Sequence, residues 1–364
     1  MAPAISDPEG LIPALLEFLA QPDVSDESFN VLALRLFAYQ FKHNLAYQRF
    51  CLLRGQTPRL VKRWQEIPAV PINAFKDLTL SCIPHPDCMR VFMTSGTTRG
   101  DVKGRNFHPS LEVYDASMRR HFQPSFMQGA ERIQMGILFP TEVMMPNSSL
   151  AHYLALAVEH FGSFKSTYFM DEAGLRVDAL CAVLDEAQRE GEPLALLGAS
   201  YAFVHLFDAL DERGVTYELP VGSRILDTGG FKGQSREVPM EAFYAQLSAT
   251  FGIERKNCIN MYGMTELSTQ FYDQGNETIP SVKRGPHWIR SRLVDPLTGR
   301  EVPFGERGVL AHTDLANFNS VTTILTEDVG VATQDGFVLL GRAQGVETKG
   351  CSMAVDELLR SAAA

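Results

Sequence analysis

The stretch VFMTSGTTRGDVKG, residues 91–104, places three apolar residues directly before a loop of hydroxyl side chains and glycines. Apolar residues that lead into small, hydroxylated ones are typical of a buried strand that runs into a tight turn. Glycines let such a turn close around a ligand, and its hydroxyl and N–H groups can hydrogen-bond phosphate oxygens. The stretch therefore predicts a strand followed by a phosphate-binding loop, and a plain surface turn rich in serine and threonine is the alternative.

Strand-like and helix-like segments alternate after this loop. The predicted strands cover residues 134–139, 167–170, 194–197, 224–227 and 258–262, and the predicted helices cover 148–161, 177–189, 201–213 and 239–251. Such alternation is typical of βαβ units, in which helices cover a parallel sheet. Ligands of these sheets bind in the loops that follow the carboxyl ends of the strands. We therefore expect an α/β fold with layered, mostly parallel sheets flanked by helices.

Three consecutive regions differ in sequence texture. Residues 1–90 are predicted to be mainly helical, with helices over 11–20 and 28–50. Residues 91–288 form the expected α/β core. From residue 289 to residue 364 short β segments alternate with turns, which predicts a small β subdomain closed by a helix over 354–360.

Composition excludes several classes of protein. The 364 residues carry a formal net charge of −10, which argues against broad binding of nucleic acid or of anionic membranes but leaves room for one nucleotide. The six cysteines form no C-x-x-C pair and no cluster with zinc-ligand spacing. The sequence begins without a basic leader, and no apolar run approaches the roughly 20 residues of a membrane span. We therefore expect a cytoplasmic protein whose cysteines are thiols.

Two more motifs follow predicted strands. In NMYGMTE, residues 260–266, an aromatic, a glycine, a hydroxyl and a carboxylate can stack on a base, approach phosphate and hold a hard cation. In TEDVG, residues 326–330, which LGR follows at 340–342, an aspartate in a turn can hydrogen-bond ribose hydroxyls. Each motif alone is weak because such turns are structural in most proteins. Their order and spacing are much more specific.

The succession TSGTT, YGMTE, TEDVG and LGR resembles the adenylate-forming superfamily of acyl- and aryl-CoA ligases, luciferases and peptide-synthetase adenylation domains. The resemblance covers about residues 91–359. It implies the large N-terminal domain of those enzymes, with ATP and Mg²⁺ as cofactors for the activation of a carboxylic acid. It also implies binding of the ATP phosphates by the loop residues Thr94, Ser95, Gly96, Thr97 and Thr98.

The same resemblance implies roles for the later motifs. Tyr262 would face the adenine, with Gly263 after it and the glycine turn Gly229-Gly230 beside it. Thr265 would contact phosphate, and Glu266 would be the carboxylate associated with magnesium. The remaining roles implied are ribose binding by Asp328 with help from Arg342.

The sequence departs from the superfamily pattern in two places. Members normally continue beyond the Gly-Arg element as a mobile lid domain that supplies a catalytic lysine, whereas this sequence ends soon after Arg342, so we expect the lid to be missing. The phosphate loop has Arg99 directly after the pair Thr97-Thr98. Lys103 is a candidate for the usual cation of the loop, and a solvated loop lysine is the equal alternative.

The run GRAQGVETKGCSM, residues 341–353, narrows the resemblance. It is similar to the acyl-protein synthetases of the bacterial luminescence fatty-acid reductase complex, which are also short and lack the lid, and GGFKG with Lys232 fits the same group. That similarity implies acyl transfer from AMP to Cys351 as a thioester and then to a protein partner. A thiolate attacks a mixed anhydride readily, and Lys349 together with a helix start near residue 353 would favour the thiolate. The alternative is a small buried cysteine.

Three hypotheses remain open from the sequence. The first is activation of a carboxylic acid, expected to be a fatty acid, with transfer through Cys351 to a reductase or carrier protein. The second is a ligase of the phenylacetate–CoA type, with CoA as acceptor and a structural Cys351. The third is a nucleotide-binding relic without catalysis. No nucleic acid is expected as a partner.

The acyl chain is expected to bind between the phosphate loop and the glycine pair. Flexible methionine-rich walls suit an aliphatic chain. His152 is either a polar group of that pocket or a histidine on a helix face. The candidate lining residues, for which plain core is the alternative, are Met135, Leu138, Phe139, Met144, Met145, Leu150, Tyr153 and Phe169.

Overall fold

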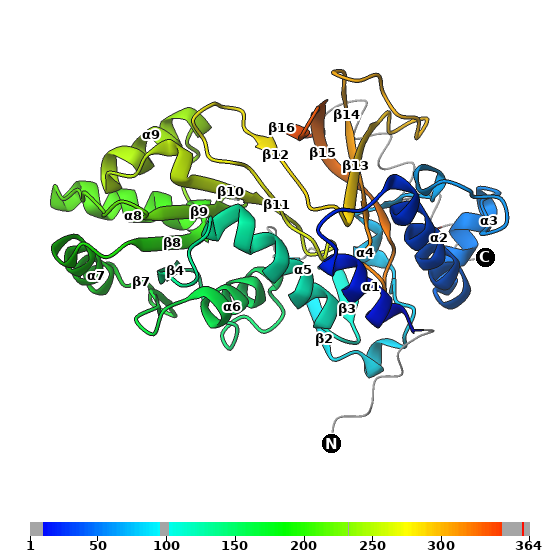
Figure 1. The fold of residues 1–364 in the computed structure, drawn as a ribbon, viewed down its shortest axis with the longest axis horizontal. Helices are drawn as coiled ribbons and strands as arrows, with labels where there is room; N and C mark the ends of the chain where they lie inside the picture. Colours follow the sequence, from blue (N-terminus) through cyan, green and yellow to red (C-terminus); the bar gives the residue numbers. More distant parts are fainter. Residues whose placement is uncertain (1–9, 95–101, 232, 344–358, 360–364) are drawn as a thin grey trace. The chain divides into compact units, whose positions relative to one another are not determined.

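The computed structural model describes residues 10–94, 102–231, 233–343 and 359. The chain forms two compact units, each built from separate stretches of sequence, which Figure 1 traces from blue to red. The first unit comprises Met1–Arg120, Met264–Thr269 and Arg284–Ala364, and the second comprises His121–Gly263 and Gln270–Lys283. These units cut across the three consecutive regions that the sequence suggests, because short segments near residues 264 and 284 pack with distant parts of the chain.

The second unit is built on a sheet whose strand order is β11-β10-β9-β8-β4-β5. All pairings in it are parallel except that of β10 with β11. The sheet strands are β4 (Gln134–Leu138), β5 (Thr167–Tyr168), β8 (Leu194–Ala199), β9 (Arg224–Thr228), β10 (Cys258–Tyr262) and β11 (Phe271–Tyr272). Every residue of β4, β8 and β10 is buried, as expected of parallel strands covered on both faces. The predicted strands therefore form.

One of those strand predictions was too long. Residues 167–170 divide into β5 and β6 (Met170–Asp171), and β6 pairs with β7 (Gly174–Leu175) in a separate antiparallel hairpin. Phe169, between them, still donates its N–H to the carbonyl of Ile137 at 2.9 Å. The chain therefore leaves the main sheet one residue later than β5 itself ends.

Four helices of the second unit lie close to their predicted positions. They are α6 (Ser149–Phe161), α7 (Val177–Glu190), α8 (Ser200–Arg213) and α9 (Met240–Phe251). Leucine and phenylalanine side chains from α7, α8 and α9 join those of β8 and β9 in one buried cluster. Each fully buried side chain of this kind contributes about 1.5–3 kcal/mol. This packing holds the helices against the sheet from whose strands the loops of the unit extend.

The first unit contains an antiparallel sheet in which β16, β15, β14 and β13 are neighbours in that order. These strands are β13 (Ile289–Val294), β14 (Arg307–Asp314), β15 (Thr323–Thr333) and β16 (Gly336–Arg342), and β1 (Val70–Pro71) joins β15 in parallel. A separate hairpin pairs β2 (Arg90–Met93) with β3 (Arg105–His108). Two-residue β12 (Val282–Lys283) belongs to the second unit.

The helices of the first unit are α1 (Leu11–Ala20), α2 (Asp26–His43), α3 (Leu45–Leu53), α4 (Ala74–Asp77) and most of α5 (Glu112–Phe122). Helix α1 forms where it was predicted. The single helix predicted over 28–50 was wrong, because Asn44 leaves the helical conformation and its side chain accepts a hydrogen bond from Tyr47 N at 3.2 Å. That cap starts a second helix.

The helix predicted over 354–360 lies outside the described residues except for residue 359. Among the residues that the structure describes, no helix has the length and apolar character needed to span a bilayer.

Candidate functional site

The β2–β3 hairpin of the first unit holds both ends of the serine- and threonine-rich loop. Thr94 donates its N–H to the carbonyl of Gly104 at 3.0 Å, and its hydroxyl accepts from Gly104 N at 2.9 Å. Lys103, next to Gly104, is exposed. The predicted phosphate-contacting residues between these ends, which are Ser95, Gly96, Thr97 and Thr98, lie outside the described residues.

The carboxylate of Glu266 lies against this hairpin. A Cβ atom on Gly104 would stand 3.0 Å from Glu266 Oε1 and 3.1 Å from Thr94 Cγ2. Both distances are tighter than ordinary van der Waals contact, so a larger residue at position 104 would require Glu266 or Thr94 to shift by a few tenths of an ångström. The structure therefore brings Thr94 and Glu266, two of the predicted site residues, close together. It adds Gly104, which the sequence analysis missed although it closes the same stretch.

Glu266 is almost completely buried, with 4% of its surface exposed. Burial raises the pKa of its carboxyl to about 7, and the nearby Asp328 adds to that rise, whereas the positive charges of Lys76 and Arg342 act in the opposite direction. An ionised carboxylate is costly in such a place unless cations surround it. Lys76, on α4, is a second neighbour that the sequence analysis did not single out.

This donor set fits a magnesium ion that arrives with a nucleotide. No group of three or more His, Cys, Asp or Glu side chains that could cage a metal is found among the described residues. Magnesium commonly uses one or two carboxylates and takes its other ligands from substrate phosphates and water. The single buried carboxylate of Glu266, beside a loop of hydroxyl groups, matches that pattern.

Asp328 and Arg342 lie opposite each other on β15 and β16. Arg342 Nε is 3.9 Å from Asp328 Oδ1, and Arg342 Nη1 is 3.9 Å from Glu327 Oε2. Asn73 in turn donates a hydrogen bond from its side-chain amide to Glu327. The strand register thus places Asp328 and Arg342 side by side, and their role in ribose binding stays a prediction.

Buried polar side chains hold the backbone on either side of Glu266. Asn106 Nδ2 donates to the carbonyl of Thr265 at 3.1 Å, and Asn317 Nδ2 donates to that of Glu266 at 2.8 Å. Asp314 accepts from the backbone N–H groups of Ser268 and Thr269 at 3.0 and 2.9 Å. The sequence signal for Asp314 and Asn317 is the run TDLANFNS, residues 313–320, which is rich in polar residues and is buried throughout.

The other residues predicted to bind the nucleotide belong to the second unit. Gly229 follows β9 with a φ of 76°, a conformation that favours glycine, and a Cβ on Gly230 would meet open space. Tyr262 ends β10 with 9% of its surface exposed, and its ring centroid is 5.8 Å from that of Phe271. Gly263 follows Tyr262 directly and is the last residue of its segment of the second unit.

Comparison with known proteins identifies the family. A family model described as acyl-protein synthetase, LuxE, matches residues 17–360. The chain belongs to this family. It is 22% identical over 332 residues to the long-chain-fatty-acid–luciferin-component ligase of Vibrio harveyi, a match that covers 88% of this chain and 85% of that protein. It is also 22% identical over 317 residues to the ligase of the same name from Aliivibrio fischeri, with 86% and 80% covered.

Solved structures confirm the fold class. A 2-hydroxyisobutyryl-CoA ligase in complex with 2-HIB-AMP and CoA matches with a TM-score of 0.66 and 16% identity, over 87% of this chain and 69% of that one. ATP-bound MatB from Rhodopseudomonas palustris matches with a TM-score of 0.52 and 16% identity, over 71% and 49%. At such identities the likeness shows the fold alone, which is that of adenylate-forming ligases.

Several residues predicted to line an acyl pocket are core residues in this acyl-protein synthetase. Leu138 and Phe169 belong to the large leucine and phenylalanine cluster of the second unit. Tyr153 is also buried, and its hydroxyl is 2.8 Å from that of Tyr272. Met144 and Met145 are 39% and 37% exposed. These positions agree with the alternative of plain core for the first three residues.

His152 is buried on the first turns of α6, where Nδ1 lies 2.9 Å from Glu142 Oε1. The ring is therefore held by a carboxylate from the segment between β4 and α6 of this acyl-protein synthetase. This pairing gives the histidine a defined partner.

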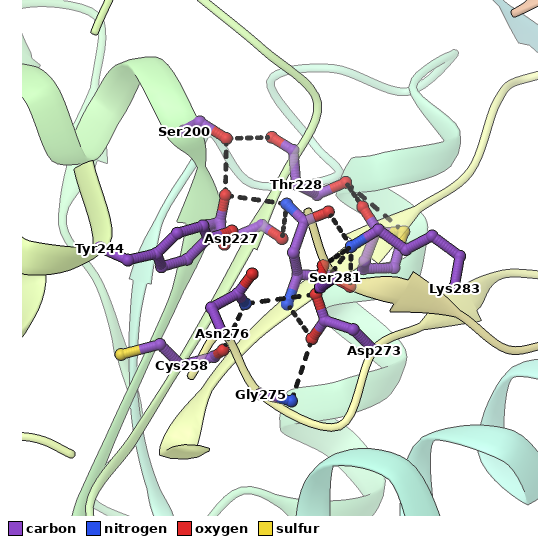
Figure 2. A network of polar contacts seen from close by, with 12 residues as sticks. Ser200, Asp227, Thr228, Tyr244, Cys258, Asp273, Gly275, Asn276, Ser281 and Lys283 are labelled. Carbon is purple, nitrogen blue, oxygen red and sulfur yellow. Dashed lines mark hydrogen bonds and ion pairs between the residues drawn. The ribbon is translucent and has the colours of Figure 1, made fainter. Parts of the chain in front are cut away.

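A buried polar network links β9 to β10 in the second unit, as Figure 2 shows. Asp227 accepts from Ser200 Oγ and Tyr244 OH, each at 2.8 Å, and from Asn260 Nδ2 at 2.9 Å. Lys283 Nζ lies 2.7 Å from Asp273 Oδ2 and donates to Asn260 Oδ1 at 2.6 Å. Burial raises the pKa of Asp227 to about 6. The network joins β9, which Gly229 follows, to β10, which ends at Tyr262.

Cys351 lies outside the described residues. The five described cysteines of this acyl-protein synthetase are free thiols. Burial raises the pKa of Cys51 and that of Cys258 to about 12 each, which makes both poor thiolates near neutral pH. Those two cysteines have the structural character that the sequence analysis expected.

Proposed function

We propose that the protein uses ATP to activate a carboxylic acid as an acyl adenylate, transfers the acyl group to Cys351 and passes it to a protein acceptor. Membership of the acyl-protein synthetase family supports the reaction class. The observation that carries the proposal for the site is the burial of Glu266 against Gly104, at the end of the serine- and threonine-rich loop. A binding relic without chemistry has no need of so costly a carboxylate.

Each step of the proposed reaction forms one bond and breaks another. A carboxylate oxygen of the acid attacks the α-phosphorus of ATP, and the bond between the α- and β-phosphates breaks to release pyrophosphate. The thiolate of Cys351 then attacks the acyl carbon, and AMP leaves with the electron pair of the broken C–O bond. A nucleophilic group of the acceptor protein finally attacks the acyl carbon of the thioester, and the C–S bond breaks to return the Cys351 thiolate.

The residues of the first unit have separate tasks in this scheme. Glu266 would hold Mg²⁺, which when bound supplies positive charge to the phosphate oxygens. Thr94, with the loop after it, would bind the phosphates together with Thr265, and Lys103 would add a positive charge. Asp328 would accept from the ribose hydroxyls, and Arg342, whose Nε lies 3.9 Å from Asp328 Oδ1, would assist.

The residues of the second unit would bind the base. We propose that Tyr262 stacks on the adenine ring, since aromatic faces bind bases in a sequence-tolerant way. The glycines that would let the backbone approach the nucleotide are Gly229, Gly230 and Gly263.

We propose a long-chain fatty acid as substrate, a protein as final acceptor and the cytoplasm as location. Both bacterial relatives are named as ligases of a long-chain fatty acid and a luciferin component. CoA is the second candidate acceptor, since a solved neighbour of the same fold contains both an acyl adenylate and CoA.

Intact-mass measurement with labelled acids, ATP and Mg²⁺ tests the proposal. The wild type is expected to gain one acyl group that hydroxylamine removes, and Cys351→Ser is expected to lose this adduct while still releasing pyrophosphate. Cys88→Ser is the matched control, because Cys88 is only partly buried and is remote in sequence from the proposed nucleophile. An adduct that survives Cys351→Ser contradicts the role of that thiol. Acyl-CoA formation at wild-type rate in the same variant favours CoA as the acceptor.

A further inference from the structure

Helix α3 of the first unit has apolar side chains on opposite faces. Its inner face buries Tyr47, Phe50 and Cys51 completely. Residues on an α-helix are about 100° apart, so an outer face is shared by three leucines and one arginine. The leucines are 61%, 53% and 58% exposed. They are Leu45, Leu52 and Leu53, with Arg49 between them. An exposed helix normally has a polar outer face, so these leucines point to a partner.

The charged side chains of α3 and of the residues that flank it are all positive. Residues 42–65 include six lysines and arginines and neither aspartate nor glutamate, in a chain whose net charge is −10. Glu66, the first acidic residue after these positions, forms an ion pair with Arg63. Arg63 Nε lies 2.9 Å from Glu66 Oε1. Exposed charges act over about a Debye length, roughly 8–10 Å at ordinary ionic strength, so the net charge of the whole chain does not decide what binds here. The cations are Lys42, Arg49, Arg54, Arg59, Lys62 and Arg63.

Backbone hydrogen bonds hold the turn that follows α3. Gln56 N donates to the carbonyl of Cys51 at 2.8 Å, and Val61 N donates to that of Thr57 at 3.0 Å. Leu60, 65% exposed, follows the exposed Arg59. The Arg54 guanidinium lies 4.4 Å from the Phe50 ring centroid. Figure 1 shows α3 and this turn beside α2, with which α3 packs.

We propose that residues 45–63 form a docking surface for an anionic lipid bilayer. Aliphatic side chains set among lysines and arginines match an interfacial element, in which leucines enter the headgroup boundary and cations meet lipid phosphates. The core of a protein–protein interface is instead enriched in aromatic side chains, and the two aromatic residues of this segment, Tyr47 and Phe50, are buried within the first unit. A bilayer is also where a long-chain acid partitions, and this purpose rests on the proposed function, whereas the binding itself does not.

Vesicle co-sedimentation of the full-length protein, without ATP or acid, tests this surface. We expect binding to vesicles of phosphatidylcholine mixed with phosphatidylglycerol, weakening as salt is raised, and none to phosphatidylcholine alone. Each neutralised cation should weaken binding roughly fivefold, which corresponds to about 1 kcal/mol, so Arg54→Gln with Arg59→Gln should weaken it roughly 25-fold. Leu52→Ser with Leu53→Ser should weaken it roughly tenfold or more.

Arg300→Gln and Val221→Ser are the matched controls, because both side chains are exposed and lie outside the segment. Equal binding to both kinds of vesicle, no binding to either, or equal loss in the controls would overturn the proposal. Self-association of the wild type that the leucine substitutions abolish, without vesicle binding, would assign the surface to a second copy of the chain and overturn it as well. Pyrophosphate release with a soluble acid, measured without vesicles on the same variants, reports separately on the proposed function.

Discussion

At the scale of single residues, the candidate site depends on side chains whose importance comes from close approach. Four site residues could be chosen from the sequence because their hydroxyl, carboxylate or guanidinium groups stand within motifs. They are Thr94, Glu266, Asp328 and Arg342. Gly104 could not be chosen in this way, since its contribution is the absence of a side chain 3.0 Å from Glu266 Oε1. Only the three-dimensional distance reveals it.

Gly104→Ala is expected to slow the exchange of pyrophosphate into ATP several-fold, since small displacements lower the rate in preorganised sites. The new Cβ would require Thr94 or Glu266 to shift by a few tenths of an ångström. Val102→Ala, in the same hairpin connection but exposed, is the control and should retain the wild-type rate. Equal rates for wild type and Gly104→Ala, at equal thermal stability, would show that the close approach has no catalytic role.

Asp227 makes the stability of the protein depend on pH. Its folded pKa, raised by burial to about 6, exceeds the unfolded value of about 3.9, so the native state binds more protons between these values. The free energy of unfolding contributed by Asp227 is therefore highest below about pH 4 and falls as pH rises through about 6, by roughly 3 kcal/mol in total.

Urea denaturation of the wild type and of Asp227→Asn at several pH values between 4.5 and 7 measures this dependence. The stability advantage of the wild type over Asp227→Asn is expected to shrink as pH rises through that window. Asp208 is half-exposed and forms an ion pair with Arg236. Asp208→Asn is the control and should show no such trend. An advantage that grows with pH would mean that Asp227 is ionised throughout and that the hydrogen bonds from Ser200 and Tyr244 outweigh its burial.

At the scale of elements, strands were easier to predict than helix boundaries. The fully buried strands β4, β8 and β10 appear in sequence as short apolar runs, and turn residues bound them clearly. The break between α2 and α3 has a weaker signal, in which the basic residues Lys42 and His43 precede Asn44. The hydrogen bond from Tyr47 N to the Asn44 side chain then shows that Asn44 is a cap and not an interior residue.

Asn44→Ala is expected to lower the free energy of unfolding by about 1–3 kcal/mol, because it removes the cap of α3 and the hydrogen bond from Asn44 Nδ2 to the carbonyl of Ser320. Gln48→Ala, one turn into the same helix, is the control with an expected change within about 0.5 kcal/mol. Chemical denaturation measures both. A loss no larger than that of the control would mean that the helix break is held by tertiary packing rather than by its cap.

At the scale of the whole molecule, sequence order conceals how the motifs are distributed. The stretch NMYGMTE reads as one motif, yet Gly263 belongs to the second unit and Met264 to the first. Segments 264–269 and 284–364 join the first unit through contacts with residues far away in sequence, such as Asp314 with Ser268. The α/β class could be predicted because alternation is local, whereas the discontinuous units depend on long-range packing that no local pattern records.

Nucleotide and magnesium are expected to stabilise the molecule only together. A ligand present at about 100 times its dissociation constant adds about 2.7 kcal/mol to the free energy of unfolding. Since no carboxylate cluster surrounds Glu266 among the described residues, Mg²⁺ without nucleotide should shift the melting temperature little, and chelation should remove most of the shift that ATP produces. Glu266→Gln should lose the magnesium-dependent part of the shift while melting no lower than the wild type without ligand, because it removes a buried charge. Glu306→Gln, on the exposed turn before β14, is the matched control. A full shift with ATP in the presence of chelator would contradict the assignment of Glu266 to the metal.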